Sequence, residues 1–285
     1  MAKTLPESLQ SACTQLGVAG AQLRYMRAGA GEPVVLLHTL RTQLDMFVGV
    51  LERLDLSRTE LIALDLPGHG HSSAPRVDYT AGYFTDVVEQ FLARIDVQDA
   101  VLVGESIGAT IALTLAARRN QRVQAVIAIN PYDYGRWGGI RRSSALANAL
   151  FTAILWPGIG AAVAGGETKS ILRAVLAGGV YDAHVLQPEL LAELHQCGAR
   201  PGHAQALRSL CRQWRSFVAA REHYPQIEAP ITLVYGDHDW SRPTEQDSNR
   251  GRIPDARLVA LERCGHFASL DQPAAIARLI TSELP

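Results

Sequence analysis

Residues 101–108 read Val-Leu-Val-Gly-Glu-Ser-Ile-Gly, and they decide the fold of this 285-residue chain. The apolar run 101–103 predicts a buried strand, and the alanine-rich stretch after it predicts a helix. Between them stands G-x-S-x-G, a sharp turn that lifts the hydroxyl of Ser106 above the edge of a sheet. Gly104 and Gly108 flank the serine because a Cβ atom at either position would clash across the turn. The stretch therefore predicts a nucleophilic serine at a helix N-terminus, where the dipole favours negative charge.

Short apolar runs recur on both sides of this turn. They are uninterrupted and bounded by turn residues, as expected for strands buried on both faces of a parallel sheet. The runs span residues 34–37, 61–64, 100–103, 125–128, 231–234 and 258–261. Between these runs, residues 83–95 repeat with a helical period. After the last run, Asp271 as N-cap and Pro273 in the first turn predict a C-terminal helix. Strands alternating with helices predict an α/β fold.

The alternation stops between the fourth and fifth runs. Residues 131–225 have helical composition without a convincing strand, which predicts an all-α insertion between two parts of one core, 1–130 and 226–285. Within it, residues 143–166 carry no charge and are long enough to span a bilayer. Asn148 and the Pro157-Gly158 pair interrupt the stretch, so we expect two short helices and no stable membrane insertion.

Composition and charge exclude several classes of function. The chain has 27 Lys and Arg against 28 Asp and Glu and no basic block, which argues against nucleic-acid binding. Its four cysteines are far apart, which argues against a disulfide framework. Because residues 1–20 hold no apolar stretch, we expect a cytoplasmic protein. The His69-x-His71 segment is interpreted as a turn, and no further cluster completes a metal site with Asp237–Asp239, so no metal is predicted. No nucleotide motif is present, so no cofactor is predicted.

A serine nucleophile needs a base, and the base needs an acid to hold it. Two late segments offer these groups, each just past the end of a predicted strand. Asp237 and Asp239 follow the strand at 231–234, and His266 follows the strand at 258–261. The chain order of serine, acid and histidine is that of the α/β-hydrolase triad.

Several stretches together resemble the α/β-hydrolase superfamily, in its capped serine esterase and peroxidase-like form. They are Leu36–His38, Asp65–Ser72, Gly104–Gly108, Gly236–Asp239 and Gly265–His266. The resemblance implies a mostly parallel sheet flanked by helices, with an all-α cap formed by the insertion.

The resemblance also implies a role for individual residues. Ser106 would be the nucleophile, His266 the base and Asp239 the acid, because the family pattern G-x-x-D selects Asp239 over Asp237. The N–H of Ile107 would be one oxyanion donor and that of Leu40 the second. Thr39 stands where the family has glycine, and its side chain or that of Gln43 could add a donor.

Aromatic residues of the insertion predict an apolar substrate pocket, although each could instead form the core of the lid itself. Arg41 in the oxyanion loop would pair with an anionic group of the substrate or point to solvent. The predicted pocket residues are His38, Arg41, Tyr132, Trp137, Phe151, Trp156, Trp240 and Phe267, with Tyr134 and Trp214 as further aromatics of the insertion.

The predicted function is cofactor-independent hydrolysis of a carboxylic ester, or of a thioester or lactone, on a small hydrophobic substrate. The same residues would serve a C–C bond hydrolase, an acyltransferase or a perhydrolase, because fold alone does not decide the reaction. A low-turnover receptor for a small molecule is the alternative from another class.

Overall fold

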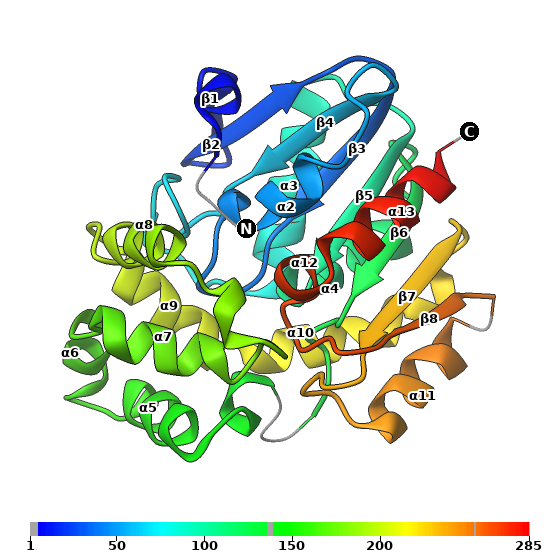
Figure 1. The fold of residues 1–285 in the computed structure, drawn as a ribbon. Coiled ribbons are helices and arrows are strands. Elements are labelled where there is room, and N and C mark those ends of the chain that lie inside the picture. The colour runs from blue at the N-terminus through cyan, green and yellow to red at the C-terminus, as the bar shows by residue number, and fades with distance from the viewer. Residues whose placement is uncertain (1–4, 136–138, 254, 285) are drawn as a thin grey trace.

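A single eight-stranded sheet forms the centre of the molecule, which is a computed structural model describing residues 5–135, 139–253 and 255–284. The strands lie in the order β1-β2-β4-β3-β5-β6-β7-β8 (Figure 1). Strands β3 to β8 are mutually parallel, and β1 and β2 join antiparallel at one edge. The strands are β1 (Cys13–Val18), β2 (Ala21–Ala28), β3 (Glu32–Leu37), β4 (Thr59–Leu64), β5 (Ala100–Glu105), β6 (Val123–Ile129), β7 (Ile231–Gly236) and β8 (Arg257–Leu261).

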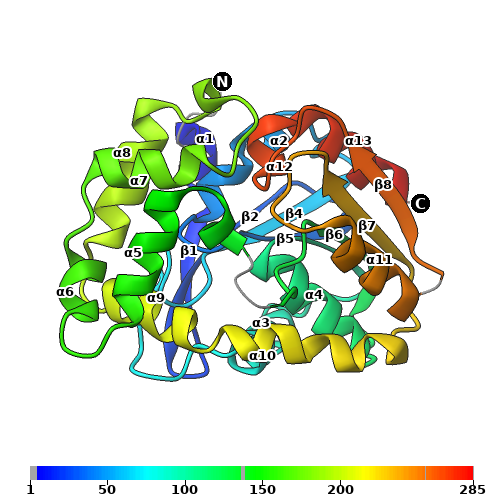
Figure 2. The same ribbon diagram turned by 90° about the horizontal axis from the view of Figure 1, so that it is seen from below.

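Helices cover both faces of the sheet. Helices α3, α4 and α10 lie on one face and α2, α12 and α13 on the other (Figure 2). The helices are α1 (Glu7–Gln10), α2 (Val48–Leu51), α3 (Ala81–Arg94), α4 (Ile107–Ala117), α5 (Ala145–Leu155), α6 (Gly160–Gly165), α7 (Lys169–Ala177), α8 (Pro188–Gly198), α9 (His203–Arg212), α10 (Trp214–Ala220), α11 (Pro243–Arg252), α12 (Ala268–Asp271) and α13 (Pro273–Glu283). Four 3₁₀ turns accompany them, η1 (Leu44–Phe47), η2 (Gly139–Arg142), η3 (Ala183–Val185) and η4 (Arg221–Gln226). The predicted fold class, a mostly parallel sheet flanked by helices, is confirmed.

The apolar runs form the strands that the sequence predicts, but their burial differs. Every residue of β5 and of β7 is buried, because helices cover both faces of these central strands. Strand β8 lies at the sheet edge and exposes most of its residues, Leu258 among them. The expectation of burial on both faces is therefore wrong for β8.

The segment between β6 and β7, here called the helical insertion (residues 131–225), contains no strand among its described residues. It gathers at one end of the sheet, green to yellow in Figure 1. The uncharged stretch forms α5 and α6 with the turn at Pro157-Gly158 between them, as predicted. Ser144 begins α5 by accepting the N–H of Ala147 at 3.1 Å. Among the described residues, none of the helices combines the length and the apolar character needed to cross a membrane.

The start of the last helix corrects one prediction. Pro273 begins α13 after Gln272, whereas Asp271 ends the preceding helix α12. The Asp271 carboxylate instead accepts the backbone N–H groups of Gly265 and Tyr181, both at 2.8 Å. Asp271 is thus not the N-cap of α13 and holds the loop that carries His266.

Candidate active site

The turn between β5 and α4 places Ser106 in a strained conformation. Its backbone has φ 59° and ψ −115°, a region that non-glycine residues rarely occupy. A Cβ on Gly104 would lie 2.3 Å from the carbonyl oxygen of Gly108, and one on Gly108 would lie 2.1 Å from that of Leu37. Both glycines are therefore required by close backbone contact, as the sequence predicts.

The structure brings the three predicted triad residues together. The Oγ of Ser106 lies 2.8 Å from Nε2 of His266, and Nδ1 of His266 lies 2.5 Å from Oδ1 of Asp239. The His266 and Asp239 side chains are fully buried, so their interaction is little screened by solvent. The arrangement is that of a nucleophile, a base and an acid that orients the base.

The choice between the two aspartates is clear from their contacts. Burial opposes the charge of Asp239, but His266 and hydrogen bonds from Ser241 outweigh it and lower the pKa of Asp239. Asp237 instead accepts the backbone N–H groups of Arg263 and Cys264, each at 2.9 Å. Asp237 therefore closes a turn, and Asp239 is the carboxylate that contacts the histidine.

A pocket of about 480 Å³ lies between Leu40 of the predicted oxyanion loop and the helical insertion, and Ser106, Asp239 and His266 are not part of its wall. Tyr132 belongs to its wall, and the Tyr132 backbone N–H donates to the Ser106 carbonyl oxygen at 3.1 Å, which connects this wall to the turn that holds Ser106. The remaining wall is mostly apolar and aromatic, with two arginines. It includes Leu40, Tyr134, Ile140, Arg141, Phe151, Leu155, Leu210, Trp214 and Arg215.

The chain is similar to known proteins of one fold. Residues 32–166 match the family described as the alpha/beta hydrolase fold. The chain has the α/β-hydrolase fold, and this segment carries the sequence pattern of the family. It is 24% identical over 285 residues to a 2-hydroxymuconate semialdehyde hydrolase of Pseudomonas sp. (strain CF600), covering 96% of this chain and 94% of the relative. It is 25% identical to an uncharacterised protein of Mycobacterium tuberculosis over 92% of this chain and 78% of that protein.

The structure of the enol-lactonase from Burkholderia xenovorans LB400 superposes with a TM-score of 0.77 and 22% identity. The match covers 95% of this chain and 99% of that one. At this identity the superposition supports the fold only. Together with the hydrolase relative, the family match makes this α/β-hydrolase an enzyme of the hydrolase class.

Two residues that the sequence did not single out for these roles hold the histidine in place. Asn130, at the end of β6, donates from Nδ2 to the carbonyl oxygens of Gly265 at 3.1 Å and His266 at 3.0 Å. Trp240, predicted only as a pocket residue, stacks on the His266 ring with centroids 3.9 Å apart. Its Nε1 donates to the Gly178 carbonyl oxygen at 2.8 Å. The sequence signals for these roles are weak: Asn130 is a polar residue shortly after a predicted strand, and Trp240 is an aromatic residue directly after Asp239.

A buried carboxyl group lies directly before Ser106. Glu105 is fully buried, and its Oε2 contacts both the hydroxyl and the backbone N–H of Ser269. Burial outweighs these hydrogen bonds and raises the pKa of Glu105 to about 8. Glu105 is therefore mostly protonated at neutral pH and links the end of β5 to helix α12, just beyond His266.

The predicted oxyanion loop packs against the start of α4. A Cβ on Gly108 would lie 2.8 Å from the carbonyl oxygen of His38, so the helix that begins at Ile107 contacts this loop. The Thr39 carbonyl oxygen accepts from the Thr42 hydroxyl at 2.9 Å, which closes the loop on itself. Leu40 lines the pocket, and Thr39 is buried.

Other predicted pocket residues lie elsewhere. His38 is fully buried, accepts the Leu66 N–H at 2.9 Å and contacts the Thr39 carbonyl oxygen at 2.7 Å, and burial lowers its pKa to about 4. Its place is under the loop, and its ring nitrogens hold backbone groups. Trp156 ends α5 with 62% of its surface exposed, which is wrong for a pocket wall. Trp137 lies outside the described residues.

Phe267 and Arg41 also have partners other than the pocket. Phe267 is buried and contacts the rings of Trp240 and His266 edge-on, so it packs against the histidine ring. The Arg41 guanidinium pairs with Glu167 and donates to the Leu194 carbonyl oxygen at 3.0 Å. The Arg41 guanidinium is therefore paired within the protein, and it links the predicted oxyanion loop to the helical insertion.

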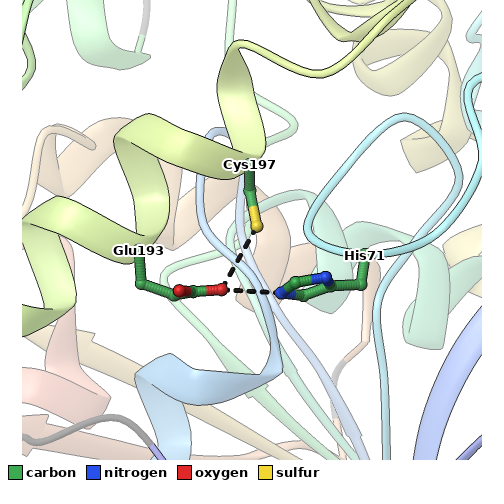
Figure 3. A group of neighbouring side chains, drawn as sticks. All are labelled: His71, Glu193 and Cys197. Atoms are coloured by element: carbon green, nitrogen blue, oxygen red, sulfur yellow. Dashed lines mark hydrogen bonds and ion pairs between the residues drawn. The ribbon is translucent and has the colours of Figure 1, made fainter.

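Outside the triad, the described residues include one group whose side chains could hold a metal ion. It consists of His71, Glu193 and Cys197 (Figure 3). His69 does not take part, because its ring is buried and contacts the carbonyl oxygen of Pro67 at 3.0 Å.

Proposed function

We propose that this α/β-hydrolase is a serine hydrolase that cleaves a carboxylic ester, thioester or lactone of a hydrophobic substrate. The supporting observation is the continuous contact from the Ser106 hydroxyl through His266 to Asp239. A serine is a weak nucleophile on its own and becomes reactive when a positioned imidazole removes its proton.

The reaction follows from the positions of these groups. His266 takes the proton of Ser106 as Oγ attacks the acyl carbon, and Asp239 stabilises the imidazolium that forms. The N–H groups of Ile107 and Leu40 hold the oxyanion, since one begins α4 and the other lies in the loop packed against it. His266 then protonates the leaving group, and a water activated by the same residue hydrolyses the acyl-enzyme.

The pocket supports a substrate that is largely apolar. Phe151, Leu210 and Trp214 come from the helical insertion, which thereby acts as a lid over the site. Tyr134 is buried, and its hydroxyl has no hydrogen-bond partner within the described ranges. We assign this hydroxyl to a polar oxygen of the substrate, because a buried donor without a partner is costly.

Active-site labelling tests the proposal. A fluorophosphonate probe should label the wild-type protein and leave Ser106→Ala unlabelled. A series of p-nitrophenyl esters from acetate to palmitate then measures which acyl-chain lengths the pocket accepts. We expect kcat/KM to rise with the first added carbons. Absence of wild-type labelling would point to a receptor, and a steady fall of kcat/KM with chain length would contradict the apolar pocket.

C–C bond hydrolysis is the second candidate. A relative named 2-hydroxymuconate semialdehyde hydrolase matches this chain over nearly the full length of both proteins. Assaying 2-hydroxymuconate semialdehyde beside the ester series separates the two reactions. A kcat/KM for this compound well above that of every ester would favour C–C cleavage on the same triad.

A further inference from the structure

Three side chains from two parts of the fold meet between the core and the helical insertion (Figure 3). His71 comes from the loop after β4, whereas Glu193 and Cys197 lie one turn apart on α8. The His71 Nε2 lies 2.6 Å from Oε1 of Glu193, and the Cys197 Sγ donates to the same oxygen at 3.4 Å. All three ligand atoms lie within 4.8 Å of one another.

The three ligand atoms are nitrogen, oxygen and sulfur, the types that bind zinc in proteins. Zinc bonds to nitrogen, oxygen and sulfur of about 2.0–2.3 Å place tetrahedral ligand atoms roughly 3.3–3.8 Å apart. The sulfur–oxygen distance already falls in this range, and the nitrogen–oxygen distance must widen by roughly 0.7 Å. Glu193 can supply this change, because its side chain is 23% exposed and has three rotatable bonds.

The surrounding contacts hold the ligands in place. The His71 backbone N–H donates to Asp65 Oδ2 at 2.7 Å, which fixes the loop that presents the imidazole. Gln43 Nε2 donates to the Glu193 carboxylate at 3.4 Å. The spacing of four residues on α8 keeps the carboxylate and the thiol on one helix face. Ligands supported in this way from neighbouring residues are typical of metal sites.

We propose that His71, Glu193 and Cys197 form a zinc site that ties the helical insertion to the core. One imidazole nitrogen, one carboxylate oxygen and one thiolate sulfur bind the ion, and water takes the fourth position. Cys197 loses its thiol proton to solvent when zinc binds, so the affinity falls as the pH is lowered. Since the ligands come from both parts of the fold, bound zinc raises the melting temperature.

Calorimetry on the full-length, reduced and chelator-treated protein tests this site with ZnCl₂. We expect one equivalent with a Kd of about 1 µM or tighter. Cys197→Ser and His71→Gln should each weaken binding about 100-fold. Two matched controls should bind like the wild type. Cys211→Ser removes another thiol, and His184→Gln breaks an exposed histidine–aspartate pair.

A cobalt spectrum gives a second measurement. Co²⁺ should produce thiolate charge-transfer and tetrahedral visible bands that Cys197→Ser abolishes and Cys211→Ser retains. Circular dichroism in chelator shows whether each variant is folded. If a variant is not folded, the zinc affinity of Glu193→Gln and the cobalt spectrum of the wild type test the site in its place. A wild-type Kd weaker than about 100 µM, or binding unchanged by Cys197→Ser and His71→Gln, would show that the three side chains form only a hydrogen-bonded contact.

Discussion

Replacing Glu105 by glutamine should change how the stability of the protein depends on pH. Glu105 is fully buried next to Ser106 in the chain, and its Oε2 contacts Ser269. Its other oxygen, Oε1, has no hydrogen-bond partner in the part of the chain that the structure describes. Glutamine has nearly the same shape and keeps an acceptor for Ser269, but it cannot ionise. The variant therefore removes the titration and leaves the packing in place.

The size of the effect follows from the pKa of this carboxyl group. Burial raises it from 4.5, its ordinary value, to about 8. Between these pH values the folded protein holds a proton that the unfolded chain releases, so stability falls as the pH rises. The contribution is fully present below about pH 4.5 and lost above about pH 8. At about 1.4 kcal/mol per pH unit, the whole window amounts to about 5 kcal/mol.

Urea unfolding of both proteins from about pH 5 to about pH 8 measures this difference. The free energy of unfolding of Glu105→Gln minus that of the wild type should increase by up to about 1.4 kcal/mol for each unit by which the pH rises. Asp133→Asn is the matched control, because burial raises the pKa of Asp133 to about 6 and its effect ends near that pH. Parallel curves for wild type and Glu105→Gln would refute the buried, protonated state of Glu105.

Three further predictions concern the acid, the stacked indole and the loop anchor. Asp239→Asn should lower kcat by about 10⁴-fold on a p-nitrophenyl ester, whereas Asp237→Asn stays near wild type; the reverse would make Asp237 the acid. Trp240→Leu should lower kcat about tenfold with little change in KM and Trp240→Phe less, because a ring still stacks on the histidine; equal losses would argue against stacking. A double-mutant cycle of Arg41→Ala and Glu167→Gln, measured by urea unfolding, should give a coupling free energy of about 1–3 kcal/mol. Arg41→Ala should also raise KM equally for anionic and neutral esters. A rise in KM for anionic esters alone would restore the substrate-pairing role.

The central strands could be predicted from the sequence because their signal is local. Runs such as 101–103 are apolar throughout, and the sheet buries both of their sides. Strands β1 and β2 were not predicted, because β1 is mostly half-buried or exposed and β2 mixes buried with exposed residues and includes Arg24. The Arg24 guanidinium is neutralised by Asp45 and Asp65, which lie in other elements. A charged residue inside a strand becomes understandable only when its distant partners are known.

The candidate site divides in the same way. Ser106, Asp239 and His266 could be placed because each follows a strand within a short motif, and strand ends meet at one edge of the sheet. Which aromatics face the pocket could not, because that depends on how the helices of the insertion pack. Phe151 and Trp156 lie in or directly after α5, yet the first lines the pocket and the second is exposed to solvent.

The geometry of the triad depends on contacts that its motifs do not contain. The loop that carries His266 is held from β6 by Asn130, whose Oδ1 also accepts the Gly236 N–H at 3.0 Å at the start of the acid loop. It is held from β5 by the contact of Glu105 with Ser269. Both contacts are buried, where a polar group without its partner costs about 1–3 kcal/mol, so the loop cannot shift without losing them. The strand ends therefore fix the distance between base and nucleophile.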